Sequence, residues 1–491
     1  MTKLSSIFIL ILMTWSCKKT TIVFNGMAND NLELPLLLNL NGKSCVFDEQ
    51  IGILKYSITE DDLEDFSPFV EFQAYSIIKF NGQDLTNQSV NKFEDLKLNE
   101  AYPITFITGD ETNTFTLLFT SIPMIQIITI DPITNGPKTL SRMILNYPEK
   151  EKMSKTNWIG IENRGKTSLS YDKKSFGIEI YQDKIADTKI DQSYFDFESN
   201  QKWILDAMFV DISKLRNRTS FELWNLMNEP IDQNGISSKF VEVFINHRSQ
   251  GLYSFTENYT EKFLDLNSQS VLYKGTDNSK VTKFNDLPEK EPNSAYWTNW
   301  EQSFPNPSEA IVWDDFEELS TLIVNGSNTE FKNNIGQLID IDNIIDYFLF
   351  INLCGGSDNV GKNWFFLKRD NSTKFTILPW DLDGTWGRNP FAEETSFSNT
   401  VTNNLFIRLQ NTNPNNYNSR LKERWIELRS FEFSENNLTN LFSTNFNTLN
   451  SFDIIDSENL RWETTISLEH EAAYITNWIT NRLIFLDELF D

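Results

Sequence analysis

Residues 358–387 contain side chains that could accept a proton and bind a metal ion. Asp358 and Asn363 form the pattern D-x-x-x-x-N, and Asp381 and Asp383 follow within the same stretch. In protein kinases an Asp accepts the proton of the attacking hydroxyl, the Asn of this pattern binds a metal ion, and a later Asp binds the same metal cluster. The spacing alone is weakly specific, because Asp and Asn are common in turns. It indicates a phosphotransfer site only if these residues meet in space.

The elements around this stretch would bring its two acidic ends together. Residues 363–369 and 374–378 read as two short strands joined by a turn, so that Asp381 follows the second strand. The preceding segment, 342–353, carries a helical apolar stripe and ends at two glycines. A calcium loop is the other interpretation of the DLD triplet at 381–383. It lacks the regular third oxygen ligand and the distal Glu of an EF-hand.

Composition limits the classes of protein. A chain of 491 residues, 40% hydrophobic and 13% aromatic, is expected to form two or three globular units. Its formal charge of -26 repels phosphate backbones, which argues against general nucleic-acid binding and favours a basic partner or a bound cation. The simpler interpretation is an acidic, soluble surface.

Cysteine and histidine are too scarce for several kinds of site. Cys17, Cys45 and Cys354 are too few for a disulfide framework and too far apart for a zinc knuckle. His247 and His470 are the two histidines of the chain, so a His-rich metal site is hard to assemble.

The amino terminus has the features of an export signal. A lysine precedes an apolar run at residues 7–13, which is too short to span a bilayer, and Ser16 precedes Cys17. The sequence predicts a lipoprotein signal peptide over 1–17 with lipidation at Cys17. Simple secretion with a free or buried thiol is the alternative. The expected location is the cell envelope, on the periplasmic face or the outer surface, with membrane contact only through the lipid anchor.

The chain changes character twice after this signal. Residues 18–122 contain short alternating runs separated by turns, which predicts an immunoglobulin-like β-sandwich. Residues 123–400 are mixed, and helical periodicity dominates residues 401–491. The predicted fold class is therefore α+β. Strands are expected at 124–130, 141–147, 175–181 and 240–246, and helices at 213–228 and near the carboxy terminus, where Ile475, Trp478, Ile479, Leu483, Leu486 and Leu489 share one face.

Residues 160–167 match the phosphate-binding pattern G-x-x-x-x-G-K-T. A true P-loop opens a helix, whose backbone amides and dipole face the phosphates. The alternating run at 175–181 predicts a strand instead, so a hairpin is favoured here. A P-loop hydrolase, which would require Lys166 and a metal at Thr167, ranks last among the functions.

Several motifs within residues 124–430 resemble the CotH kinase family (spore coat protein H-like), in the form carried by exported bacterial lipoproteins. Their order along the chain is far more specific than any one motif. They are Arg164-Gly165, Lys173 to Phe176, Trp203 to Leu205, Asp211 to Asn217, Gly251 to Tyr253 with Glu257, Asp358, Lys362 to Trp364, and Pro379 to Gly384.

The resemblance implies a divergent two-lobed protein-kinase-like domain with a helical carboxy-terminal portion, placed after the β-sandwich. It implies an atypical kinase that transfers the ATP γ-phosphate to protein Ser residues, with Mg²⁺ or Mn²⁺. Asp358 would be the catalytic residue, and Asn363, Asp381 and Asp383 would bind metal.

The resemblance also implies a set of nucleotide contacts. Lys173 or Lys174 would reach the phosphates, and alternation along a strand lets only one of them point inward. Arg164 would belong to the turn that covers the phosphates, and Glu257 would contact adenine or ribose. Glu222 is a possible ion-pair partner for the lysine, because Arg216 lies where other kinases place that Glu.

Two functions remain open from the sequence. One is the kinase, acting on a protein substrate whose Ser lies in a basic segment. The other is a non-catalytic exported surface or adhesion protein that binds a protein or glycan through a kinase-like fold.

Overall fold

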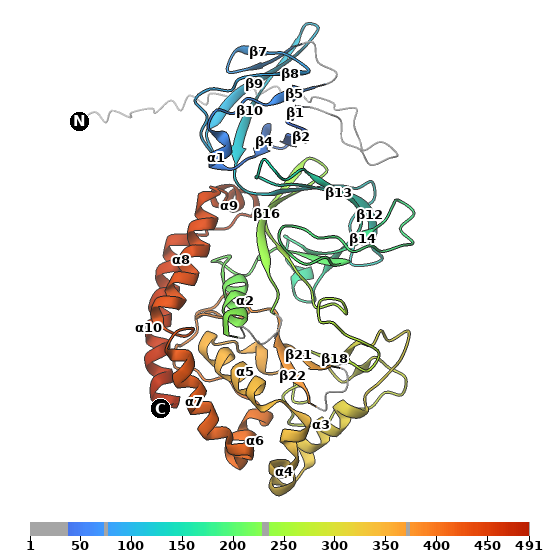
Figure 1. Cartoon of the computed structure of the whole chain (residues 1–491), viewed down its shortest axis with the longest axis vertical. Helices are drawn as coiled ribbons and strands as arrows, with labels where there is room; N and C mark the ends of the chain where they lie inside the picture. Colours follow the sequence, from blue (N-terminus) through green and yellow to red (C-terminus); the bar gives the residue numbers. More distant parts are fainter. Residues whose placement is uncertain (1–37, 73–76, 228–234, 370–373, 491) are drawn as a thin grey trace, which may run out of the picture.

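The computed structural model describes residues 38–72, 77–227, 235–369 and 374–490. The predicted signal peptide and Cys17 lie outside these ranges. Figure 1 shows three parts stacked along the long axis: a small β unit, a β-barrel beneath it, and a larger mixed part at the other end. Helices α8 and α10 run along one side of the lower parts.

The amino-terminal unit consists of two sheets that share one hydrophobic core. This arrangement is a sandwich, and its relation to immunoglobulin-like domains stays a prediction. A short helix, α1 (Glu60–Leu63), begins at the Thr59 cap. The first sheet contains β2 (Lys43–Ser44), β1 (Asn39–Leu40), β5 (Phe69–Glu71) and β8 (Ser89–Val90), and the second contains β3 (Val46–Asp48), β4 (Ile53–Ser57), β10 (Glu111–Thr120), β9 (Ala101–Thr108), β6 (Ile77–Phe80) and β7 (Gln83–Leu85).

A closed barrel follows, and parallel pairing of its first strand with a later hairpin closes it. The four strands expected here are confirmed, whereas closure was not anticipated from the sequence. Helix α2 (Arg216–Met227) lies in the connection after the fifth strand. In spatial order the strands are β11 (Met124–Ile128), β12 (Thr139–Asn146), β13 (Lys155–Arg164), β14 (Ser175–Tyr181), β15 (Lys202–Asp206), β17 (Arg248–Thr256) and β16 (Ser238–Ile245).

The third part combines a five-stranded sheet with most of the helices. Its sheet order is β19 (Tyr296–Trp297), β20 (Trp300–Phe304), β18 (Val271–Thr276), β21 (Lys362–Lys368) and β22 (Thr376–Pro379). The helices are α3 (Asp314–Asn325), α4 (Asn328–Leu338), α5 (Ile341–Cys354), α6 (Asn404–Thr412), α7 (Tyr417–Arg429), α8 (Glu435–Ser451), α9 (Ile455–Trp462) and α10 (Leu468–Phe490).

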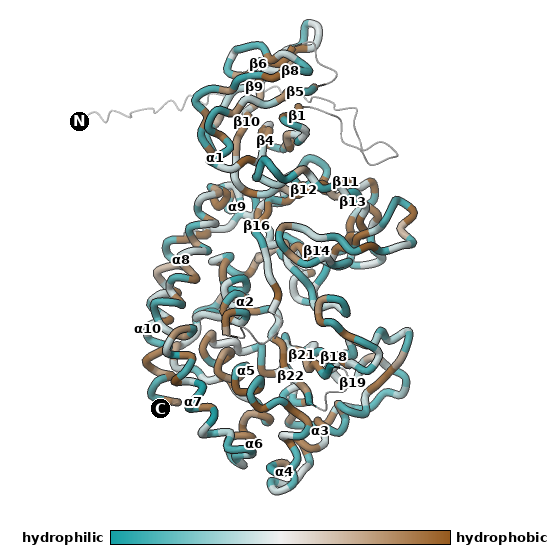
Figure 2. Tube along the Cα trace, viewed as in Figure 1, coloured by the Kyte–Doolittle hydropathy of each residue, from teal (hydrophilic) through white to brown (hydrophobic). Residues whose placement is uncertain are grey.

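Helix α5 organises this part and is its most apolar helix along the trace in Figure 2. The Asp340 carboxylate caps its amino terminus, and Gly355 ends it at a φ of 73°, a left-handed conformation that favours glycine. Asn343, fully buried on α5, accepts a hydrogen bond from the Ile377 amide of β22 at 2.6 Å. The predicted helix and hairpin are confirmed, and α5 holds the strand that leads to Asp381.

Helix α10 buries most of the face expected from its sequence. Ile475, Trp478 and Leu486 are buried, whereas Leu489 is 48% exposed and Phe490 is buried in its place. The last turn therefore packs one residue later than the pattern predicts. Within the part of the chain that the structure describes, no helix has the length and apolar character needed to cross a membrane.

Candidate active site

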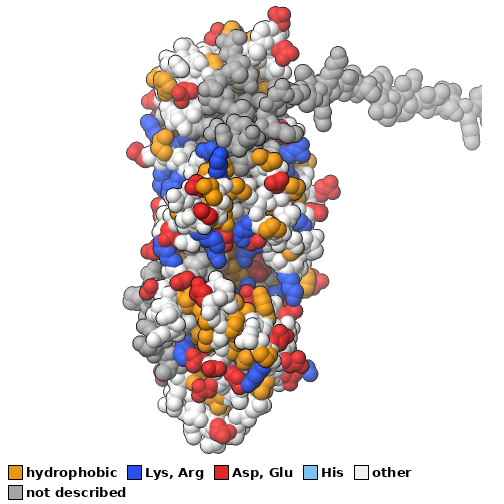
Figure 3. Space-filling view, turned by 90° about the vertical axis from the view of Figure 1, so that its right-hand side faces the viewer, with side chains coloured by type: hydrophobic (Ala, Val, Ile, Leu, Met, Phe, Trp, Pro, Cys, Tyr) orange, Lys and Arg blue, Asp and Glu red, His pale blue; other side chains and the backbone are white. Residues whose placement is uncertain are grey.

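A cavity of about 730 Å³ lies between the barrel and the third part. On the face seen in Figure 3 the molecule is hollowed near mid-height, and Lys and Arg side chains gather around the hollow. Six residues expected from the sequence to serve the site line the cavity: Arg164, Lys173, Asp358, Asn363, Asp381 and Asp383.

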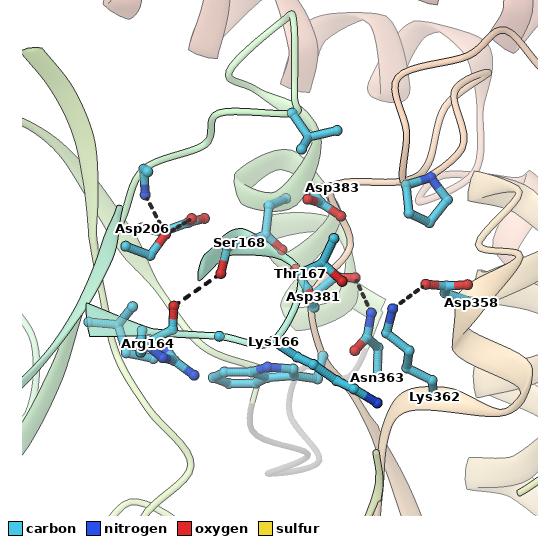
Figure 4. Close-up of a pocket in the computed structure, with 18 of the residues that line it drawn as sticks. Arg164, Lys166, Thr167, Ser168, Asp206, Asp358, Lys362, Asn363, Asp381 and Asp383 are labelled. Carbon is cyan, nitrogen blue, oxygen red and sulfur yellow. Dashed lines mark hydrogen bonds and ion pairs between the residues drawn. The ribbon is translucent and has the colours of Figure 1, made fainter. Parts of the chain in front are cut away.

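Asp358 lies in a single 3₁₀ turn, Asp358–Val360, that follows α5 directly. Its carboxylate accepts a hydrogen bond from Lys362 Nζ at 2.8 Å and another from Asn278 Nδ2 at 3.3 Å. Figure 4 shows Asp358 and Lys362 on one side of the cavity, with Asp381 and Asp383 nearby. A carboxylate held this way, with only 17% of its side chain exposed, is placed to accept a proton from a hydroxyl in the cavity.

Asn363 and Asp381 are held side by side by their backbones. The Trp380 amide donates to the Asn363 carbonyl at 3.0 Å, and Asn363 Nδ2 approaches the Asp381 carbonyl at 3.5 Å. The buried Asn359 amide donates to the carbonyls of Asn363 and Trp380, at 3.0 and 2.8 Å. Asn217 of α2 accepts a hydrogen bond from the Leu382 amide at 2.9 Å, so a helix that connects two barrel strands also holds this segment in place.

Two of the three candidate metal ligands adopt left-handed backbone conformations, with φ of 59° at Asn363 and 53° at Asp381. Asn and Asp tolerate this region better than most residues, yet it still costs conformational energy. Such strain persists where the surroundings impose it, and it is common at functional sites.

The acidic residues of the cavity carry more negative charge than their surroundings readily accommodate. Burial, followed by the charge of Asp206, raises the pKa of Asp381. Burial and the neighbouring charge of Asp381 raise the pKa of Asp383 well above its usual range. A bound cation would relieve this repulsion, because it favours the ionised form of each carboxylate.

The donor set fits a hard divalent cation. Carboxylate and amide oxygens are the ligands that Mg²⁺ and Mn²⁺ prefer. Among the described residues there is no group of three His, Cys, Asp or Glu side chains poised to hold a metal. The candidate set consists instead of Asn363, Asp381 and Asp383, so solvent or phosphate oxygens would complete the coordination.

Residues 165–168 form the roof of the cavity between β13 and β14. A single 3₁₀ turn, Ser168–Ser170, and then the strand β14 follow, in place of the α-helix that a P-loop opens, so the P-loop interpretation is wrong and the hairpin interpretation is confirmed. Ser168 Oγ donates to the Arg164 carbonyl at 3.0 Å and tightens the turn. Lys166 is exposed and pairs with Asp277 at 2.8 Å.

The two adjacent lysines point in different directions, although both lie before β14 and not within the strand as expected. Lys173 is fully buried and lines the cavity, and its ammonium group contacts the Leu252 carbonyl and the Glu458 carboxylate. Lys174 does not line the cavity, and its ammonium group donates to the carbonyls of Leu169 and Tyr171.

The helix α2 side chains do not pair with Lys173. Arg216 is fully buried between Asp211 at 2.9 Å and Glu471 at 3.0 Å. Glu222, the partner considered from the sequence, contacts Arg218 and Asn445 instead. The lysine partner is Glu458 of α9, which lies 285 residues away in the sequence.

Glu257 is not among the residues that line the cavity. It follows β17, is only 5% exposed, and accepts the Ser237 amide at 2.8 Å. Burial raises the pKa of Glu257 to about 7. The structure therefore does not bring the predicted hinge contact to the cavity, and it gives Glu257 a structural environment.

Sequence reasoning missed two residues of the cavity. Lys274 on β18 projects beside the rings of Phe365 and Trp380, and burial lowers its pKa. Asp206 ends β15, and its carboxylate accepts the Met208 amide at 3.1 Å. A lysine inside the short apolar strand at 271–276 was the available signal for the first, and an Asp directly after the WIL run for the second.

The arrangement defines a class of protein: a kinase-like protein, with a proton acceptor, metal-type ligands and cations in one cavity between two parts of the fold. The family model "CotH kinase protein" matches residues 161–486, about two thirds of the chain. The chain belongs to the CotH kinase family.

Individual relatives are more distant. The inner spore coat protein H of Bacillus subtilis is 23% identical over 260 residues, which span 52% of this chain and 64% of that protein. The match thus covers slightly less than two thirds of the relative's length. The crystal structure of the Helicobacter pylori proinflammatory kinase CtkA is 12% identical, with a TM-score of 0.28, covering 60% of this chain and 89% of the other. That structural similarity is too low to support a functional conclusion.

The environment of Glu257 predicts a pH-dependent stability difference. The pKa of Glu257 is about 7 in the folded protein and near 4.5 in the unfolded chain. The protonated carboxyl therefore contributes its full stability to the fold below pH 4.5, and that stability is lost as the pH rises through 7. Glu257→Gln should therefore increase the free energy of unfolding by on the order of 3 kcal/mol at pH 8, and by about 1 kcal/mol or less at pH 5. Urea unfolding at the two pH values measures this, with exposed Glu261→Gln as the control. Equal effects of Glu257→Gln at both pH values would contradict it.

Proposed function

We propose that this protein is an atypical protein kinase that transfers the γ-phosphate of ATP to Ser residues of a protein, with Mg²⁺ or Mn²⁺. The observation that carries the proposal is the meeting of Asp358, Asn363, Asp381 and Asp383 in one cavity roofed by residues 165–168. Membership of the CotH kinase family supports it.

The acidic side chains divide the work. Asp358 would accept the proton of the Ser hydroxyl as the oxygen attacks the γ-phosphorus and the bond to the ADP oxygen breaks. Its contact with Lys362 holds it at the edge of the cavity. Asn363, Asp381 and Asp383 would hold the divalent cation. When bound, that cation offsets the charge of the triphosphate and of the transition state.

The basic side chains offset the remaining phosphate charge. Arg164, Lys173 and Lys274 all line the cavity, and burial lowers the pKa of each. The cost of burying these cations falls when an anion enters, which favours a polyphosphate ligand. The roof at 165–168 would exclude water from the transferring group.

Removal of the acidic residues tests the reaction. With γ-labelled ATP and Mg²⁺ or Mn²⁺, the wild type should incorporate label by autophosphorylation. Asp358→Asn and Asp381→Asn should each reduce the rate by about 100-fold or more, because they remove the proton acceptor and a metal ligand. Chelation of the metal should abolish incorporation in the wild type.

The control for this experiment is Asp286→Asn, which changes an exposed carboxylate outside the cavity. Calorimetry of ATP binding accompanies it. A wild type that incorporates no label and binds no ATP with metal would contradict the kinase, and would favour a surface protein that uses this fold to bind a partner.

The proposed substrate is a protein Ser in a basic segment. The formal charge of -26 supports this, since an acidic protein attracts basic partners and repels acidic ones. Ser peptides flanked by Lys should be phosphorylated with a kcat/KM at least about threefold above that of peptides flanked by Glu, with the difference shrinking at high salt. A preference for the acidic peptides would remove the idea.

We also propose that the protein is exported and held at the cell envelope by a lipid on Cys17, which the apolar run at 7–13 and the pair Ser16-Cys17 support. The protein should incorporate labelled fatty acid and fractionate with membranes, and Cys17→Ser should release it into the soluble fraction. Equal membrane association of both forms would show that another attachment is responsible.

A further inference from the structure

The ion pair between Lys173 and Glu458 joins two distant parts of the chain at the cavity. Lys173 lies two residues before β14 of the barrel, and Glu458 projects from the carboxy-terminal helix α9. Their side chains are 0% and 1% exposed. Leaving either charge alone in this environment would be costly, so the position of α9 and the position of the lysine are tied together.

The barrel is shaped to admit the Glu458 carboxylate. Its second oxygen accepts the Leu252 amide at 2.9 Å, beside the carbonyl that Lys173 contacts. Gly251 has a φ of 81°, and a Cβ at that position would lie 2.1 Å from Glu458 Oε2. Glycine therefore serves two needs here, a left-handed turn and the close approach of the carboxylate.

Helix α9 also contacts the amino-terminal sandwich, which packs on the barrel as well through pairs such as Lys55 with Glu242 at 2.8 Å. Arg461 of α9 donates to the Gln50 side chain, and Asn99 Nδ2 donates to the carbonyl of Ser451, the last residue of α8, at 3.2 Å. Trp462 Nε1 donates to the Gln250 carbonyl of β17 at 3.1 Å. In Figure 1, α9 lies beside β16, just below the sandwich. One short helix thus contacts the sandwich, the barrel and the cavity lysine.

We propose that Glu458 is the positioning residue for Lys173 in nucleotide binding, and that the sandwich maintains this position by holding α9. This inference rests on the proposed kinase function. It assigns to a carboxy-terminal helix the role that a helix of the amino-terminal lobe has in other kinases, where a Lys and Glu pair must be in place for activity. It also gives the sandwich an indirect role in nucleotide binding, although the sandwich does not line the cavity.

The direct test is calorimetry of ATP binding in the presence of Mg²⁺. The whole protein, including the sandwich, is used. Glu458→Gln should weaken ATP binding by about 10-fold and raise the KM for ATP more than it lowers kcat, because the lysine loses its orientation while Asp358 is untouched. Exposed Glu463→Gln on the same helix end is the matched control and should bind as the wild type does.

The pH profile separates positioning from a general loss of structure. Lys173 faces Glu458 of α9, Asp206 of β15, Lys214 before α2 and Tyr253 of β17, and burial lowers its pKa to about 8. Without the Glu458 carboxylate the lysine should lose its proton at lower pH. The fall in ATP affinity with rising pH should therefore begin at lower pH in Glu458→Gln than in the wild type.

A second variant covers the case in which Glu458→Gln does not fold. Arg461→Gln removes the contact with Gln50 while the buried pair remains, and it should weaken ATP binding about threefold with Asp358 and the metal ligands unchanged. The inference would be overturned if Glu458→Gln bound ATP with wild-type affinity and a wild-type pH profile. If Glu458→Gln does not fold, wild-type affinity in Arg461→Gln would overturn it. Either result would leave the proposed kinase function in place. A wild type that binds no ATP would overturn both.

Discussion

Repulsion among the carboxylates that line the cavity is the constraint on which the rest of this structure depends. Asp206, Asp381 and Asp383 come from two different parts of the fold. The charge of Asp206 raises the pKa of both Asp381 and Asp383, and the charge of Asp381 also raises the pKa of Asp383. Such a cluster is tolerable only where cations offset it. Arg164, Lys274 and Lys362 reach the same cavity from three separate segments, and a divalent cation would add the remaining positive charge.

The carboxy-terminal helices complete the site as well as cover the core. Glu471 of α10 pairs with Arg216 at the start of α2 and with Arg388, which follows the DLD segment. Arg482, about three turns further along α10, contacts the carbonyls of Asn352 and Phe397. Helix α10 therefore holds the segment that follows Asp383 in place, through Arg388 and the Phe397 carbonyl. Removal of the carboxy-terminal part would leave Lys173 and Arg216 as buried charges without these carboxylates.

Local signals in the sequence were sufficient for many of the elements. The helix over 341–354 follows from its apolar stripe and its glycine stop, and the strand at 175–181 follows from alternation. Alternation predicted that Lys173 and Lys174 could not both face the cavity, and one of them does not, but both lie outside the strand to which that argument applies. The choice depends on burial, because only the inward lysine finds a carboxylate.

The sequence by itself indicated the order of the elements along the chain and the candidates Asp358, Asn363, Asp381 and Asp383, because capping, alternation and the D-x-x-x-x-N spacing act over a few residues. Tertiary structure alone decided the partner of Lys173, the entry of Lys274 into the cavity, and the exclusion of Lys174 and Glu257 from it. These outcomes depend on closure of the barrel and on the docking of α9 against it. Contacts between residues hundreds of positions apart leave no periodic pattern in a single sequence, since their energy arises only once the chain has folded.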